Sequence, residues 1–157
     1  MSTYEWLLIG HLLGVFVLVM AGGISAGTGF AATRATSGLA VVTLLDLQRK
    51  SDLYAFSIGG VAAIVFGTLL VNETNYGYGD AWISASYTIV IAMFAVVHAI
   101  MAPRAKRARE YAAGLGNGLV DETLKTKLND PLLNAGGLAL TVALVVLVWL
   151  MVAKPGA

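Results

Sequence analysis

Four long apolar stretches alternate along the chain with shorter segments that hold most of its charge; the stretches cover about residues 6–31, 53–71, 81–102 and 131–153. Each is near or above the roughly 18–20 residues that a helix needs to cross the hydrocarbon core of a bilayer. The fourth begins at Pro131, a residue type suited to the first turn of a helix. The pattern predicts an all-α polytopic membrane protein, a four-helix transmembrane bundle that forms one integral membrane domain over residues 1–157.

The segment between the first two stretches has an amphipathic pattern. Thr43, Asp46 and Lys50 recur at three- to four-residue spacing, with leucine and valine on most of the remaining surface. This spacing predicts a short amphipathic helix at the membrane interface after the first span, or alternatively a prolongation of the second span. Residues 103–130 predict a helix that extends the third span, a glycine break, and a short helix starting near Asp121.

Composition supports the membrane assignment and removes several chemistries. The chain is 58% hydrophobic and 12% charged, with a mean hydropathy of +0.79. Soluble domains carry roughly a quarter charged residues, so this chain lacks the charge to cover a surface in water. Cysteine is absent, which excludes disulfides and metal or iron–sulfur sites built on thiolates.

Basic residues are strongly biased to two of the connecting segments. Nine of the ten Lys and Arg residues fall within residues 32–52 or 103–130. The positive-inside rule therefore predicts that both segments are cytoplasmic loops and that both termini lie outside a bacterial inner membrane. One cluster is expected to contact lipid head groups, at about 1 kcal/mol per residue near anionic lipid, and consists of Arg104, Lys106, Arg107 and Arg109. This anchoring role accounts for the cluster, and no nucleic-acid partner is predicted.

Glycines recur at spacings that let helices approach closely. Gly10 with Gly14, and Gly23 with Gly27, are GxxxG pairs in the first span. Further glycines expected to pack against other helices are Gly22, Gly60, Gly67 and Gly137. Such faces predict association with a second copy of the chain or with a larger membrane complex.

His11 is the ionisable residue placed deepest in the first span. Steps of three and four residues from it reach Gly14, Leu18, Gly22 and Ser25, so it is expected to face protein rather than lipid. An ionisable group inside the membrane is a functional candidate, here as a haem ligand or as a partner for a quinone-like head group. The competing interpretation is a hydrogen bond that packs helices. Acids that could assist it on the outer side are Glu5, Glu73 and Asp80.

His98, in the third span, is expected to pair with Asn134, which begins the fourth span at similar depth. A rise of 1.5 Å per residue puts His11 about 8 Å below one surface and His98 about 6 Å from the other. In a core roughly 30 Å thick, about 16 Å then separates them. Two nitrogens bound to one metal lie only about 4 Å apart, so no shared metal site is predicted.

The stretches HLLGVFVLVMAGG and SAGTGFAATR resemble an uncharacterised bacterial family of four-helix integral membrane proteins, a domain of unknown function. That family is similar in layout to copper-resistance D-type membrane proteins and to HemJ-type protoporphyrinogen oxidases. The second likeness implies haem on a first-span histidine, here His11. HemJ-type proteins also use a lysine inside the membrane, and none of the predicted spans contains one.

No catalytic constellation is visible, so an enzymatic activity is not predicted. The favoured function is a small integral membrane subunit with a structural or assembly role. The alternative is a haem- or quinone-linked redox protein that uses His11. Transport ranks third, because four helices enclose little space unless the protein oligomerises.

Overall fold

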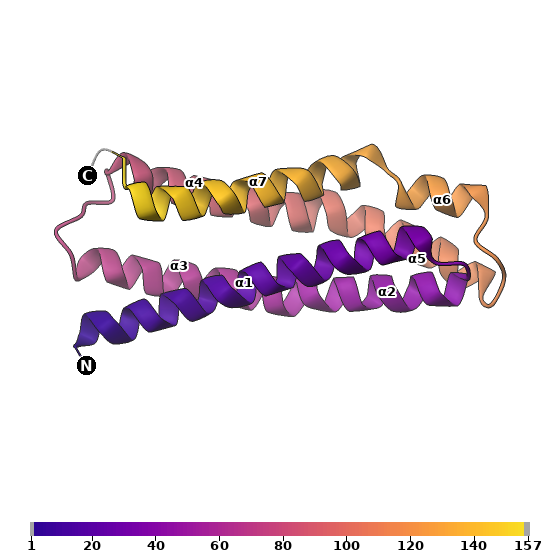
Figure 1. Cartoon of the computed structure of the whole chain (residues 1–157), viewed down its shortest axis with the longest axis horizontal. Coiled ribbons are helices and arrows are strands. Elements are labelled where there is room, and N and C mark those ends of the chain that lie inside the picture. The colour runs from indigo at the N-terminus through magenta and orange to yellow at the C-terminus, as the bar shows by residue number, and fades with distance from the viewer. Residues whose placement is uncertain (1, 156–157) are drawn as a thin grey trace.

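The structure, a computed structural model, describes residues 2–155 and contains four long helical rods (Figure 1). The first rod is α1 (Thr3–Arg34), and the fourth is α7 (Pro131–Ala153), which follows the short α6 (Glu122–Leu128). Each middle rod joins three segments without a break: α2 (Gly38–Lys50), η1 (Ser51–Phe56) and α3 (Ser57–Asn72), then α4 (Ala81–Ala95), η2 (Val96–Met101) and α5 (Ala102–Leu115). Helices long and apolar enough to span a membrane cover all four predicted stretches, which confirms the all-α four-helix architecture.

The amphipathic segment is helical, but it is not a separate helix lying on the membrane surface. α2 continues through η1 into α3, so the alternative arrangement, a prolongation of the second span, is the one that forms. The physical reason is local. Residues 48–57 contain neither glycine nor proline, so nothing in the sequence ends the helix there.

Side-chain caps fix where several helices begin. Ser2 and Glu5 form a reciprocal capping box at the start of α1. The hydroxyl of Ser37 accepts a hydrogen bond from a backbone N–H in the first turn of α2. Asp130 caps α7 in the same way, and Pro131 occupies its first turn, where a missing N–H costs nothing.

The rods are longer than a bilayer requires, and their excess length gathers at one end. The first three rods, of 32 to 35 residues, measure about 48–52 Å, and the 23 residues of α7 measure about 35 Å, against a hydrocarbon core of roughly 30 Å. Figure 1 shows both chain termini at one end of the bundle and α2, α5 and α6 at the other, which we call the basic end. The best-buried cluster of the molecule lies at the basic end and consists of Ala32, Val41, Leu45, Ala108, Ala112, Leu124 and Leu128.

Within the apolar part of the bundle, α1 packs closely on α3, and α4 packs on α7 (Figure 1). A second cluster joins the two pairs near the middle, and its buried members are Leu18, Ala21, Phe56, Met93 and Val97. Two of these residues, Phe56 and Val97, come from the π-helical segments η1 and η2. The junction between the helix pairs therefore coincides with the two places where the helices depart from α geometry.

Candidate functional site

His11 lies on the face of α1 that packs against α3. Its Nδ1 is 2.8 Å from the carbonyl oxygen of Ala63, and the ring is half-buried. A carbonyl oxygen can only accept a hydrogen bond, so Nδ1 carries the hydrogen and donates it. In the neutral imidazole this leaves a lone pair on Nε2. The ring also rests against Gly67, where an added Cβ would lie 3.1 Å from Nδ1.

The acids considered as partners of His11 lie in helix ends and turns. Glu5 belongs to the capping box of α1. Glu73 is the C-cap residue of α3, and Asp80 accepts a hydrogen bond from the backbone N–H of Gly77 in the turn before α4. The partner that the structure gives the His11 imidazole is a backbone carbonyl, which makes this contact a bridge between α1 and α3.

Glycines create the close approach of α1 and α3 around His11. An added Cβ on Gly14 would lie 2.6 Å from the backbone nitrogen of Ala63, and one on Gly59 would lie 2.6 Å from that of Leu18. One turn before Gly14, an added Cβ on Gly10 would lie 2.7 Å from the ring of Phe66. Backbone therefore packs on backbone in this interface, which leaves no room for a methyl group.

The other predicted packing glycines divide into two groups. Gly60 lies under the ring of Phe94, and an added Cβ on Gly22 would be in ordinary contact with Leu144 of α7. In contrast, added Cβ atoms on three glycines would meet no atom of the described residues within 4 Å, and these are Gly23, Gly27 and Gly137. Spacing alone does not distinguish glycines that pack within the chain from glycines that face outward, because the packed pair Gly10 and Gly14 has the same spacing as the outward-facing pair Gly23 and Gly27.

His98 has a different neighbour from the one predicted. Its Nε2 is 3.2 Å from the hydroxyl oxygen of Ser57 on α3. Asn134, the predicted partner, is exposed on the outside of α7. The reason is rotational: α7 turns Gly136 toward Met101 of η2, and a residue two positions away points to the opposite side of a helix.

A polar cluster surrounds His98 at the junction of η1 and η2, and most of it was not predicted. The Ser57 hydroxyl donates to the carbonyl oxygen of Asp52, 3.2 Å away. The half-buried Asp52 carboxylate interacts with Ser25 on α1 and, electrostatically, with His98. Nearby, the buried Ser51 hydroxyl donates to a carbonyl of α1 at 3.2 Å. A usable sequence signal existed, because Asp52 and Ser57 flank the start of the second apolar stretch at the depth of His98.

The two histidines contact α3 at different heights. His11 contacts Ala63 and His98 contacts Ser57, six residues apart, which corresponds to about 9 Å along the helix axis. The structure thus contains two separate polar contacts, one between α1 and α3 and one between α3 and η2.

Basic residues at the basic end interact largely with neighbouring acids. Arg109 donates two hydrogen bonds to Asp46 of α2, at 2.8 and 2.9 Å. The Arg104 guanidinium lies 3.5 Å from the Asp130 carboxylate, and the Lys106 ammonium lies 3.7 Å from a carboxylate of its own helix. Arg107 is exposed. The cluster expected to meet lipid head groups therefore also ties α5 to α2 and to the start of α7.

One hydrogen bond links α5 to the cap of α6 outside the apolar region. The phenolic O–H of Tyr111 donates to Asp121 at 2.7 Å, and the same carboxylate accepts from the backbone N–H of Leu124 at 2.8 Å. These two donors, the phenol first, hold the pKa of Asp121 below its ordinary value. Asp121 therefore stays ionised as the N-cap of α6, where a negative charge suits the helix dipole.

Comparison with known proteins gives one match over nearly the whole chain. The model of the family DUF2269, described as predicted integral membrane proteins, matches residues 5–155. No curated protein and no solved structure matches the chain.

Proposed function

Because the chain belongs to DUF2269, a family of predicted integral membrane proteins, we propose that it is a small subunit that assembles within the membrane. Its role is structural, and its partner is a second copy of the chain or a larger membrane complex. The observation that supports this most is the outward-facing pair Gly23 and Gly27, whose space no described residue of the chain fills.

The pair lies on a continuous outer stripe of α1. Phe16, Met20 and Phe30 are 61%, 50% and 58% exposed, and with Gly23 and Gly27 they recur at three- to four-residue spacing. Bulky side chains thus flank a shallow notch at the two glycines. Helices that cross at such a notch bring their backbones together, which is how small residues promote association where lipid supplies no hydrophobic drive.

The α1–α3 interface shows what this motif does within the same chain. There Gly14 and Gly59 allow contacts between the two backbones. A stripe with the same spacing but without an occupant is consistent with an interface to another polypeptide. The rest of the outer surface needs no such explanation, because exposed leucine, valine and isoleucine suit contact with lipid tails.

The charge distribution supports an orientation for this subunit. α2, α5 and α6 carry most of the basic residues together at the basic end, whereas both termini lie at the other end (Figure 1). By the positive-inside rule we place the basic end in the cytoplasm and both termini outside the bacterial inner membrane.

Subunit counting in liposomes tests the self-association version. The chain, labelled with one fluorophore at its C-terminus, is reconstituted at low density and its bleaching steps are counted. We expect mostly two or more steps for the wild type and single steps for Gly23→Leu. The matched control is Ala92→Leu, which adds similar bulk at an exposed site on α4 and is expected to behave as wild type. Single bleaching steps for the wild-type protein at every protein density in the liposomes would contradict self-association.

A haem-linked redox role is the second candidate, and one geometric observation favours it. Metal-binding histidines commonly donate one ring N–H to a carbonyl, which fixes the ring and leaves the other nitrogen for the metal. His11 has this arrangement, with Nδ1 on the Ala63 carbonyl.

Absorption spectroscopy of protein purified from haem-supplemented cells tests this candidate. A Soret band that disappears in His11→Ala but persists in His98→Ala would support it. Colourless wild-type protein from the same cells would refute it.

A further inference from the structure

The lengths of the rods indicate where the surface of the hydrocarbon core crosses the basic end. A core roughly 30 Å thick holds about 20 residues of helix. Counted from the ends of α3 and α4 that lie near the chain termini, the opposite boundary falls near Asp52 in the second rod and near Met101 in the third. The hydrogen bond between Ser57 and His98 joins these rods five and three residues inside those positions, so the two counts give the same level.

Two cations on α2 lie just outside this level. Arg49 and Lys50 are three and two residues before Asp52, which places them about 3–5 Å beyond the hydrocarbon core, at the depth of lipid head groups. Both side chains are exposed. Their neighbours Gln48 and Ser51 are buried, and the Ser51 hydroxyl donates to a carbonyl of α1. Arg49 and Lys50 therefore project from the face of α2 that is turned away from α1.

The two cations lack the acid partners that most basic residues of α5 have. Within residues 2–155 neither forms a hydrogen bond or an ion pair, and the acid that attracts them is Asp46, one turn earlier. The Asp46 carboxylate already accepts two hydrogen bonds from Arg109. By comparison, three of the four cations of the α5 cluster have a carboxylate oxygen at 2.8 to 3.7 Å. Arg49 and Lys50 thus keep their donors available to the head-group layer.

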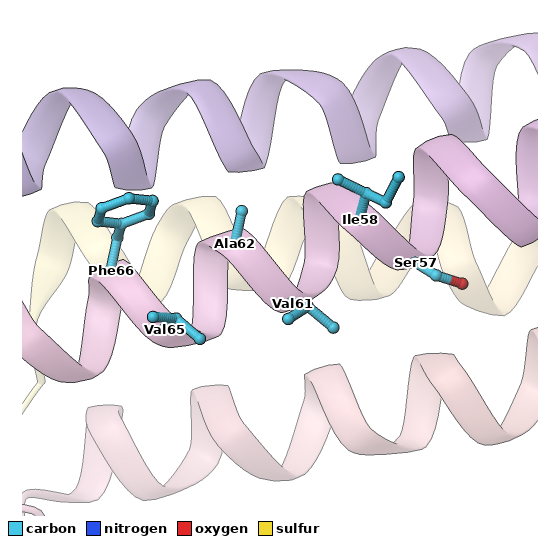
Figure 2. Close-up of a pocket in the computed structure, with 6 residues that line it drawn as sticks. All are labelled: Ser57, Ile58, Val61, Ala62, Val65 and Phe66. Carbon is cyan, nitrogen blue, oxygen red and sulfur yellow. The ribbon is translucent and has the colours of Figure 1, made fainter.

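An exposed apolar stripe leads from the two cations into the hydrocarbon core. Tyr54 is four residues after Lys50, and the stripe continues along α3 through Ile58, Val61 and Val65, with each of these side chains about half exposed or more. The α3 part of the stripe borders a shallow groove of about 430 Å³. This groove is lined by Ser57, Ile58, Val61, Ala62, Val65 and Phe66 (Figure 2). Positive charge at head-group depth is therefore continuous with an apolar surface at acyl-chain depth.

We infer that α2 and α3 together bind an anionic phospholipid, with its phosphate at Arg49 and Lys50 and an acyl chain along the exposed stripe of α3. Two adjacent cations favour a head group of net negative charge over a zwitterionic one, which carries its own cation. In this arrangement α2, rather than the α5 cluster, makes the principal head-group contact. The site uses neither His11 nor the outer stripe of α1, so it is independent of the proposed assembly role.

Native mass spectrometry of the full chain measures this binding. The protein, purified in detergent, is titrated with phosphatidylglycerol or with phosphatidylcholine of the same acyl chains, and the bound lipids are counted. We expect saturable binding of phosphatidylglycerol that is at least about tenfold tighter than that of phosphatidylcholine. Excess glycerol 3-phosphate, which has the phosphate without acyl chains, is expected not to displace the lipid.

Two charge-matched variants separate the site from the overall charge of the protein. Arg49→Gln/Lys50→Gln is expected to weaken phosphatidylglycerol binding about tenfold to thirtyfold, because each basic residue near anionic lipid contributes about fivefold. Lys106→Gln/Lys125→Gln is the control, since it also removes two positive charges, from exposed lysines that pair with acids of their own helices. It is expected to bind phosphatidylglycerol as the wild type does. Circular dichroism verifies that both variants keep their helix content.

Three results would overturn the inference. They are equal affinities for phosphatidylglycerol and phosphatidylcholine, equal losses of affinity in the two charge-matched variants, and displacement of the lipid by glycerol 3-phosphate. The last would identify Arg49 and Lys50 as a site for a soluble phosphate.

Discussion

Adding one methyl group at Gly14 is expected to separate α1 from α3. The new Cβ would lie 2.6 Å from the Ala63 nitrogen and 3.0 Å from the Gly59 oxygen. Both are backbone atoms, which cannot rotate away as a side chain would. Ordinary contact begins at 3.4 Å, so the helices must move apart by about 0.8 Å.

The expected cost follows from that displacement. A gap of 0.5–1 Å removes about a quarter to a half of the dispersion energy of each contact it opens. Overpacking of a well-packed interface typically costs about 1–3 kcal/mol. The 2.8 Å hydrogen bond from His11 to Ala63 crosses the same interface and would lengthen. We therefore expect Gly14→Ala to lower the free energy of unfolding by about 1–3 kcal/mol.

Unfolding by SDS in mixed micelles, followed by circular dichroism, measures this difference. The matched control is Gly22→Ala on the same helix but off the outer stripe, where an added Cβ would be in ordinary contact with Leu144, 3.9 Å away. Both substitutions exchange glycine for alanine inside α1, so the gain in helix propensity is similar and cancels in the comparison. If the two variants unfold at the same SDS fraction, the close α1–α3 packing is refuted.

Three further predictions concern individual hydrogen bonds and ion pairs. Asp46→Asn weakens the ion pair with Arg109, and both side chains of this pair are more than a third exposed. We expect it to lower the free energy of unfolding by at most about 1 kcal/mol, and by less in 1 M salt. An equal loss at low and high salt would contradict this. The pKa of Asp121 is lowered in the folded state, so its stabilisation is complete above its unfolded pKa of about 3.9 and is lost as pH falls through the folded value. Tyr111→Phe should raise this pKa, measured by NMR titration of the carboxyl carbon, and an unchanged titration would count against the contact. His11→Ala should lower the free energy of unfolding by about 1 kcal/mol through loss of its hydrogen bond to Ala63, whereas unaltered stability would show that the bond adds nothing.

The positions of the four rods could be predicted because span length and apolar composition do not depend on which way a residue faces. Pro131 illustrates this, since it begins α7 as its residue type suggested. The direction in which each side chain points around its helix could not be predicted in the same way, because it depends on how the helices rotate against one another. The sequence predicts similar depths for Asn134 and His98, yet in the structure Asn134 is exposed on α7 and His98 contacts Ser57.

The π-helical segments explain why the cluster at His98 was missed. Asp52 and Ser57 are five residues apart, and in an α-helix such residues point in different directions. Hydrogen bonds from residue i to i+5 in η1 bring the Ser57 hydroxyl to the Asp52 carbonyl. A π-helical turn contains one residue more than an α-helical turn, and the hydropathy pattern does not show where such a turn occurs. The two glycine pairs of α1 show the same limit, because only packing distinguishes the pair that meets α3 from the pair that faces outward.

Disulfide scanning along α1 in native membranes tests the central claim, that this subunit associates through its outer stripe. The chain has no cysteine, so each single-cysteine variant reports on one position without background. We predict that Met20→Cys, Gly23→Cys and Gly27→Cys cross-link on oxidation, to twice the chain mass or to a partner identified by mass spectrometry. Ala21→Cys, fully buried inside the bundle, should not cross-link. Cross-linking at none of the stripe positions, or equally at all four, would contradict the account.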